Sequence, residues 1–330
     1  MKRRQLLQAG AALAALPPVV RAQSAPTAVT LQIDGAAVPF YAPIYVAIEK
    51  GYFAKRGINV KLLYASAAEI AKNVAAGNVD FGFPNADAVL AARASNVPIK
   101  VIHSSYQRSI GATLFKHSSG IRTFADLKGK RVAVTTIGSP NYLQLQVGLK
   151  EAGLSMNDIQ LEVISTGAIV QALQADKVDA VVFSELRRYN LEADGVKVGV
   201  ILSNDFLPSY GNVVAASDRL VQQKGALAKA FTQALSESFQ WTIDGHAEEA
   251  IALAIDKYTP TWKGQEALLL RALRETFIPS VWQSAYTKAH GLGAGDLVAW
   301  QRSIDVLAQH KVIPKRFAAA DLVVQPSALL

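Results

Sequence analysis

Short apolar segments alternate with amphipathic segments over the first part of the chain. The apolar segments are rich in β-branched residues, which is typical of strands, and lie at 28–33, 59–63, 81–83 and 100–103. Apolar residues with helical spacing fill the intervals between them, at 43–50, 66–76 and 84–94. Strands and helices that alternate with short loops indicate an α/β fold with a largely parallel sheet.

The same alternation returns after residue 121. Its strand-like segments are 131–135, 159–164 and 180–183, and its helical segments begin at Ser139 and at Gly167. The sequence AAGNVDFGF at 75–83 is similar to LQADKVDAVVF at 173–183, and only these two copies occur. We therefore expect two related lobes and not a solenoid of repeats. Asp80 and Asp179, which occupy matching places in the two copies, are expected to serve the turns between helix and strand.

The remaining third of the chain has an almost entirely helical pattern. The predicted helices are 218–243, 247–258, 265–276 and 295–309. A helical tail cannot bury its apolar faces by itself, so we expect it to pack on one of the lobes. The four tryptophans all lie in this tail, and we interpret them as core or inter-helix packing residues.

A strand that leads directly into a helix makes the turn at 136–141 the first candidate ligand site. Ser139 can cap the helix, Pro140 suits its first position, and the free N–H groups there attract polar acceptors. Parallel sheets place ligands at the carboxyl ends of their strands, which is where this turn lies. The candidate ligand-binding residues of the turn are Thr136, Gly138, Ser139 and Asn141. The alternative is that Ser139 is only a helix cap.

A second helix start lies at Asn85 and Asp87, after the strand 81–83 in the other predicted lobe. We expect the two helix starts to approach one ligand from opposite sides, with Asn85 and Asp87 as contacts.

Composition excludes several classes of function. The chain has 51% hydrophobic and 18% charged residues, as a folded globular protein does, and it has no cysteine for a disulfide, a thiolate nucleophile or a zinc–thiolate site. The five histidines are dispersed, so we expect no metal site and no cofactor. Half of the net charge of +8 comes from four basic residues before residue 23, and the others are scattered, so we expect no nucleic-acid partner.

Residues 1–22 have the pattern of a cleaved signal peptide. Basic residues precede an apolar run from Leu6 to Leu16, and the triplet Val20-Arg21-Ala22 offers small residues for cleavage. The order Arg3-Arg4 before the run is similar to a twin-arginine signal, although a general secretory signal with two arginines looks alike. We expect the mature chain to be free in the periplasm.

Several motifs then resemble one family. The stretch PIYVAIEKGYF at 43–53 resembles the P-L-Y-V-A-x-E-x-G-Y-F stretch of ABC-transporter substrate-binding proteins. The group includes binders of aliphatic sulfonates, taurine, nitrate and the pyrimidine precursor of thiamine. The segments GINV at 57–60, AGNVDFG at 76–82 and DLKGKRV at 126–132 follow in the family's order.

The resemblance implies the two-lobed periplasmic binding protein fold of type 2, which closes on its ligand around a hinge. Lobe one would comprise 28–111 and 212–330, and lobe two 112–205, with crossings near 111–114 and 206–211. The implied partners are a small-molecule ligand and the membrane permease of an ABC transporter, and we expect a monomer.

The resemblance also suggests where the ligand binds. Phe40 and Tyr41 follow the first strand and can stack on a flat ligand, at a place where binders of the thiamine precursor have a tryptophan-led motif. The alternative is that one of them only packs under the following helix. Glu185, after the strand 180–183, would hold an amine or a ring N–H, and Ser184 and Tyr210 complete the predicted set. Glu185 would repel a bare anion, so a zwitterion or a neutral heteroaromatic molecule fits better than nitrate. The expected ligand is a small polar organic molecule, with a zwitterion, an organic anion and a heteroaromatic precursor as the open alternatives.

Two alternatives to a transport-binding protein stay open. A periplasmic sensor that signals to a membrane kinase would have the same sequence features. An enzyme of pyrimidine-precursor synthesis shares the fold, but the predicted export signal argues against it, so we expect a protein without enzymatic activity.

Overall fold

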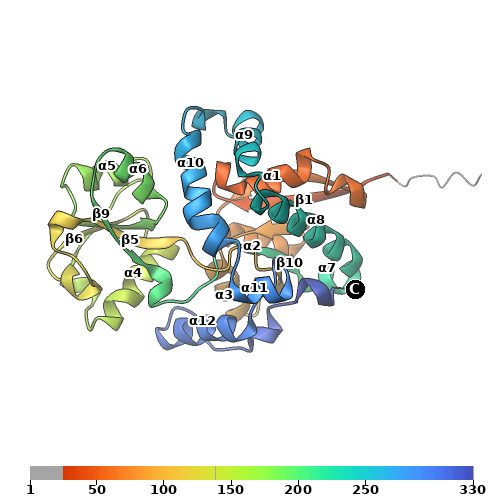
Figure 1. The fold of residues 1–330 in the computed structure, drawn as a ribbon. Helices are drawn as coiled ribbons and strands as arrows, with labels where there is room; N and C mark the ends of the chain where they lie inside the picture. The colour runs from red at the N-terminus through yellow and green to blue at the C-terminus, as the bar shows by residue number, and fades with distance from the viewer. Residues whose placement is uncertain (1–24, 138, 330) are drawn as a thin grey trace, which may run out of the picture.

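The computed structural model describes residues 25–137 and 139–329 (Figure 1). The predicted signal peptide and Gly138 lie outside this part of the chain. Two lobes stand side by side, and each contains one five-stranded sheet flanked by helices. The repeated pattern of strands and helices predicts this arrangement.

The sheet of lobe one has the strand order β2-β1-β3-β10-β4. Its strands are β1 Thr27–Asp34, β2 Ile58–Ala65, β3 Phe81–Phe83, β4 Ile99–His103 and β10 Val214–Ser217. Strand β1 is parallel to β2 and β3, whereas β10 is antiparallel to both of its neighbours. The sheet is therefore parallel as predicted, apart from one strand that enters it after lobe two is complete.

The sheet of lobe two has the order β7-β6-β8-β5-β9. Its strands are β5 Gly111–Lys116, β6 Arg131–Val134, β7 Gln160–Val163, β8 Ala180–Ser184 and β9 Val198–Leu202. Strand β5 is antiparallel to β8 and β9, and it occupies the place that β10 has in lobe one. The first crossing is expected near 111–114. These residues instead belong to strand β5 and pair with β8 and β9, so the crossing precedes Gly111.

The helices of the two alternating regions are α1 Ala42–Glu49, α2 Ala67–Ala76, α3 Ala86–Ala94, α4 Pro140–Glu151, α5 Ile169–Gln174 and α6 Arg187–Ala193. Three of these helices begin directly after a polar residue whose side chain caps them. Ser66 and Glu69 form a capping box at the start of α2, and Ser139 Oγ accepts the Tyr142 N–H at 3.1 Å at the start of α4.

The tail is helical as predicted, with differences in two of the predicted helices and one additional helix at Ala285–His290. Its helices are α7 Asp218–Gln223, α8 Gly225–Ile243, α9 Ala247–Lys257, α10 Glu266–Ala272, α11 Ala285–His290 and α12 Leu297–Gln309. The predicted helix 218–243 is interrupted at Lys224, where φ is −132°. The helix at 265–276 passes into a π-helical segment, Leu273–Val281, that contains Pro279. Within 25–137 and 139–329, no helix combines the length and apolar character needed to span a membrane.

The tail packs on lobe one and also reaches lobe two. Phe231 of α8 stacks on Phe81 of β3 with the ring centroids 4.2 Å apart. Tyr189 Oη of α6 shares a hydrogen bond of 2.7 Å with Thr276 Oγ1 in the π-helical segment. In Figure 1, α10 stands between the two lobes. The tail therefore joins the lobes in addition to the two chain crossings.

One polar contact occurs in both lobes. Asp80 Oδ2 accepts the Thr30 N–H of β1 at 2.9 Å, and Asp179 Oδ2 accepts the Arg131 N–H of β6 at 2.8 Å. Each carboxylate ties the turn before one strand to a backbone N–H of its parallel neighbour. The sequence similarity between 75–83 and 173–183 thus corresponds to the same structural contact.

Candidate functional site

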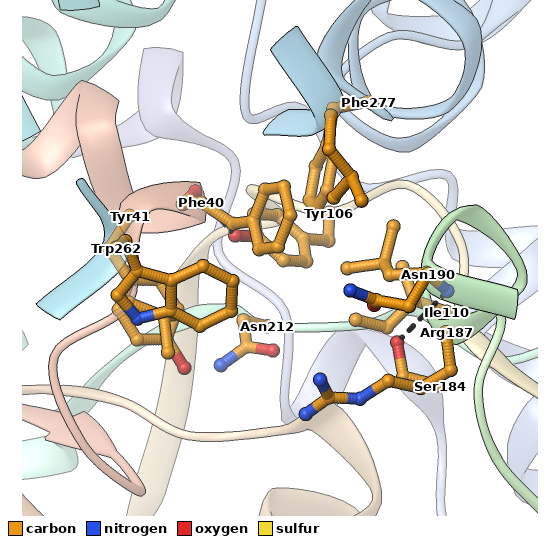
Figure 2. Close-up of a pocket in the computed structure, with 13 residues that line it drawn as sticks. Phe40, Tyr41, Tyr106, Ile110, Ser184, Arg187, Asn190, Asn212, Trp262 and Phe277 are labelled. Atoms are coloured by element: carbon orange, nitrogen blue, oxygen red, sulfur yellow. Dashed lines mark hydrogen bonds between the residues drawn. The ribbon is translucent and has the colours of Figure 1, made fainter. Parts of the chain in front are cut away.

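A cleft lies where the two lobes meet at the crossings (Figure 2). Its cavity volume is about 170 Å³, and it is partly open to solvent. Its lining comes from lobe one and the tail (Val38, Phe40, Tyr41, Tyr106, Asn212, Trp262, Leu268, Phe277), from the crossing (Ile110) and from lobe two (Ser184, Leu186, Arg187, Asn190).

Four aromatic side chains form one side of the cleft, and we call Phe40, Tyr106, Trp262 and Phe277 the aromatic wall. Phe40 stacks on Phe277 with the ring centroids 4.9 Å apart, and Trp262 meets Phe40 edge-on at 6.4 Å. Tyr106 Oη donates a hydrogen bond of 3.1 Å to the Phe40 carbonyl. These contacts fix the rings in place. Tyr106 and Phe277 are buried, whereas Phe40 and Trp262 are half-buried and offer the accessible ring surface for a flat molecule.

A short turn after β1 positions the lobe-one part of the wall. Pro39 begins a single 3₁₀ turn, Pro39–Tyr41, and its fixed φ suits that first position. Tyr41 Oη donates to the Asp34 carbonyl at 2.9 Å, which holds the turn against the end of β1. Burial raises the pKa of Tyr41, so its phenol stays neutral.

The opposite side of the cleft comes from the end of β8 and the start of α6. Ser184 ends β8, and its Oγ accepts the Leu186 N–H at 3.3 Å. Arg187 and Asn190 are three residues apart on α6 and therefore share one face of the helix. Figure 2 shows both side chains pointing from α6 towards the aromatic wall. Asn212, two residues before β10 in lobe one, donates from Nδ2 to the Phe83 carbonyl at 3.1 Å and keeps Oδ1 as an acceptor.

The cleft can therefore bind a flat ring on one side and polar groups on the other. The aromatic wall offers stacking, while one guanidinium, two amides and a hydroxyl offer hydrogen bonds. Among the described residues, no group of three or more His, Cys, Asp or Glu side chains is placed to hold a metal ion.

Three of the residues chosen from the sequence line this cleft, and they are Phe40, Tyr41 and Ser184. Asn85 instead caps α3 by accepting the Asp87 N–H at 3.0 Å, and Asp87 accepts a hydrogen bond of 2.7 Å from Ser209 Oγ. Tyr210 stacks on Trp300 at 4.4 Å, and its Oη accepts the Asp296 N–H. These residues lie in the packing of lobe one and not in the cleft lining.

The turn at the start of α4 also lies outside the lining of this cleft. Ser139 has the capping contact that its position predicts, while Thr136 is exposed and Asn141 is half-buried. Gly138 lies outside the described residues. Ligand contacts from Thr136, Ser139 and Asn141 therefore stay predictions.

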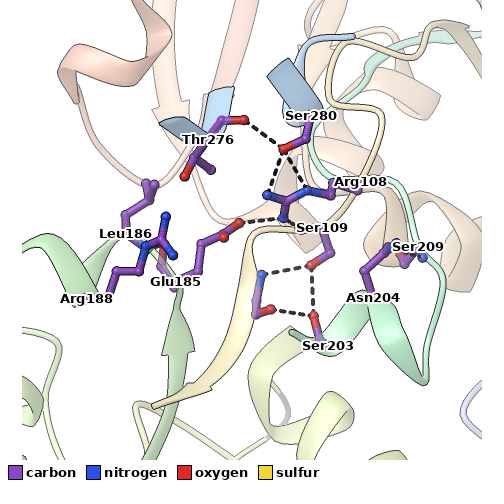
Figure 3. A network of polar contacts seen from close by, with 12 residues as sticks. Arg108, Ser109, Glu185, Leu186, Arg188, Ser203, Asn204, Ser209, Thr276 and Ser280 are labelled. Carbon is purple, nitrogen blue, oxygen red and sulfur yellow. Dashed lines mark hydrogen bonds and ion pairs between the residues drawn. The ribbon is translucent and has the colours of Figure 1, made fainter. Parts of the chain in front are cut away.

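Glu185 is buried in an ion pair (Figure 3). Its side chain is 3% exposed, and its Oε1 lies 2.5 Å from Arg108 Nη1. Arg108, in the first crossing, also donates from Nε and Nη2 to Ser280 Oγ and from Nη1 to the Ser109 carbonyl. The Glu185 carboxylate, which we expected to face the ligand, thus faces Arg108 in the first crossing.

Most of the polar and aromatic lining residues are not among the residues chosen from the sequence. Arg187 comes only three residues after the end of β8, so the rule that sites lie at strand ends could have included it. Trp262 lies in a turn, Pro260–Trp262, and not on the apolar face of a helix. This position between two predicted helices indicated a role other than packing in the core. Tyr106, Asn212 and Phe277 carry no such local signal.

Comparisons with known proteins agree with this architecture. A family model described as NMT1/THI5 like matches residues 38–250. The riboflavin-binding protein RibY of Chloroflexus aurantiacus is 27% identical over 293 residues, which cover 87% of this chain and 82% of that protein. The 4-amino-5-hydroxymethyl-2-methylpyrimidine phosphate synthase of Aspergillus parasiticus is 31% identical over 132 residues, which are 39% of this chain and 38% of the enzyme.

A solved structure shows the same fold. The periplasmic aliphatic sulphonate binding protein SsuA from Escherichia coli superposes with a TM-score of 0.69 at 19% identity, over 92% of this chain and 94% of SsuA. The two-lobed binding-protein fold and the family resemblance drawn from the motifs are therefore confirmed. The family match ends before Trp262 and Phe277, so half of the aromatic wall comes from outside the matched region.

Proposed function

The chain belongs to the NMT1/THI5-like family, and on that premise we propose that it is the ligand-binding component of an ABC importer. It captures a flat heteroaromatic molecule between its lobes and releases it unchanged. The observation that carries this proposal is the cleft, in which the aromatic wall faces Arg187 and Asn190 across the junction of the lobes.

The relatives support both parts of the proposal. RibY matches along most of both chains, and its name makes riboflavin, a flat tricyclic ring with polar edges, the first compound to test. SsuA supports the transport role by its fold. The match to the pyrimidine phosphate synthase spans only 38% of that enzyme, which favours binding over catalysis for this chain.

Export to the periplasm and a permease partner belong to the same proposal. The basic and apolar pattern of residues 1–22 supports export, after which a monomer would deliver its ligand to the permease. A ligand held by both lobes binds the closed state preferentially, so ligand binding should compact the protein.

The direct test is ligand recovery from the natively exported protein. Small molecules that co-purify should be identified by mass spectrometry, and riboflavin should be titrated separately by quenching of its fluorescence. An intact heteroaromatic compound, recovered unchanged after incubation, supports the proposal. Conversion of the bound compound would instead indicate an enzyme, and the absence of any aromatic ligand would contradict the proposed function.

Replacement of Trp262 by alanine is expected to weaken binding of a flat ligand roughly 10- to 100-fold. A stacked ring contributes about 1–3 kcal/mol to binding. Trp262 is only half-buried, so we expect a small change in the melting temperature of the unliganded protein. Isothermal titration with the recovered ligand and thermal unfolding without it measure the two effects.

Trp241→Ala is the matched control for this variant. Trp241 is also half-buried and stacks on His246 at 4.3 Å, but it lies on α8 outside the cleft lining. Equal affinity losses in the two variants would mean that tryptophan removal acts through stability and not through the aromatic wall.

A further inference from the structure

Arg187 is the one charged residue in the described lining of the cleft. Its guanidinium lies 5.2 Å from the ring centroid of Phe183, and it forms no hydrogen bond or ion pair with the residues that the structure describes. Figure 2 shows this group reaching from α6 across the cleft towards Asn212. A cation is thus held at the junction of the lobes without a partner of its own.

The nearby carboxylates on the same lobe are paired elsewhere. Glu185 faces Arg108 at 2.5 Å, and Glu192 of α6 lies 2.8 Å from Arg271. Burial lowers the pKa of the Arg187 guanidinium, and no neighbouring carboxylate offsets that effect. The sequence alone suggested that Glu185 would repel anions, whereas the structure gives the cleft a net positive lining.

We propose, building on the proposed function, that the ligand is an aromatic anion whose ring lies on the aromatic wall and whose carboxylate, sulfonate or phosphate binds Arg187. The planar fork of a guanidinium matches the oxygens of such groups. Pairing with an anion also removes the cost of keeping a half-buried charge uncompensated. A neutral ring of the same shape would satisfy the wall and leave Arg187 unpaired.

The two halves of this recognition come from different lobes. The ring contacts lie on lobe one and the tail, while Arg187 and Asn190 belong to α6 of lobe two. Both sets of contacts exist together only when the lobes are close, so the anionic group helps to select the closed state. Asn190 lies one helical turn after Arg187 and can donate a second hydrogen bond to the same group.

Matched pairs of probes test the inference on the full mature chain. Riboflavin and riboflavin 5′-phosphate share one ring system and differ in a phosphate. Quinoline-2-carboxamide and quinoline-2-carboxylate differ in the charge of one substituent. Affinities are measured by isothermal titration for the unmodified protein, for Arg187→Gln, for Arg187→Lys and for Arg122→Gln. Arg122 is exposed and outside the cleft lining, so this last variant controls for loss of one positive charge from lobe two.

We expect the anionic member of at least one pair to bind roughly 10- to 100-fold more tightly than its neutral partner. Arg187→Gln should abolish that difference, Arg187→Lys should keep part of it, and Arg122→Gln should keep all of it. The pair that shows the difference identifies phosphate or carboxylate as the group recognised.

Equal affinities within both pairs, or a preference that survives Arg187→Gln, would overturn the inference and leave the proposed function intact. Failure of all four probes to bind would contradict the proposed function, and the inference with it.

Discussion

Replacement of Arg108 by methionine is expected to lower the free energy of unfolding by roughly 3–5 kcal/mol. The cause of this loss is Glu185, the ion-pair partner that remains in the variant. Glu185 has a side chain only 3% exposed, and without Arg108 it would be a buried carboxylate with no counter-charge. Equilibrium unfolding in urea at neutral pH measures the loss.

Two further variants separate this cause from simple loss of side-chain contacts. In Arg108→Met/Glu185→Leu both charges are absent, so we expect much of the lost stability to return. Arg274→Met breaks an ion pair with Glu248 in which the two side chains are 60% and 69% exposed, and it should cost less than about 1 kcal/mol. A double variant no more stable than Arg108→Met would show that the ion pair is not the cause.

The second large effect is a loss of stability in acid that comes from His103. Burial lowers the pKa of this imidazole to about 3, and both ring nitrogens contact hydroxyls, Ser105 Oγ at 2.7 Å and Ser236 Oγ at 3.0 Å. In the unfolded chain a histidine has a pKa of about 6.5. Below that pH the unfolded state binds one more proton than the folded state, so stability falls by about 1.4 kcal/mol per pH unit down to about pH 3.

Two buried carboxyls act in the opposite direction. Burial raises the pKa of Asp34 and of Asp87 to about 6, so the folded state binds extra protons between about pH 4 and pH 6 and gains stability as the pH falls. The pH profile of the unmodified protein therefore mixes both effects. The test is the difference between this protein and His103→Gln, in which only the histidine effect is removed.

The free energy of unfolding of His103→Gln minus that of the unmodified protein should increase by about 3 kcal/mol from pH 7 to pH 4, so the variant is relatively more stable in acid. Urea unfolding at half-unit pH steps measures it. A difference that is independent of pH would mean that His103 takes up its proton equally well in the folded protein.

The elements with local caps could be predicted from the sequence, and those defined by distant pairing could not. Helices α2 and α3 begin directly after Ser66 and Asn85, whose side chains accept N–H groups of the first turn. Strand β5 was interpreted as a crossing because a buried strand and an apolar linker look alike in sequence. Its identity depends on pairing with β8 and β9, which follow about 70 and about 90 residues later.

The candidate site divides in the same way. Phe40 and Tyr41 follow the end of β1, and the sequence rule that sites lie at strand ends places them in the cleft. The same rule selects Ser139. This residue caps α4 as expected, but it lies outside the lining of the cleft. The reason lies in the strand order. Ser184 of β8 pairs with Gly111, beside the first crossing, whereas β6 lies one strand farther from it.

Trp262 and Phe277 could not be assigned to the cleft without the tertiary structure. They lie more than two hundred residues beyond Phe40, and the tail brings them to it through packing that has no local sequence signal.

Lobe two starts on β5 and ends on β9, and these strands are hydrogen-bonded neighbours in which Ala112 pairs with Leu202. The entry and exit of the segment 111–202 therefore lie side by side. Recombination between relatives can therefore exchange the whole segment 111–202 through two junctions that lie close to each other in the structure. A chimaera built in this way would inherit Arg187 and Asn190 from one parent and the aromatic wall from the other. On the proposed assignment of these residues, the fold would allow charge selectivity and ring selectivity to evolve separately.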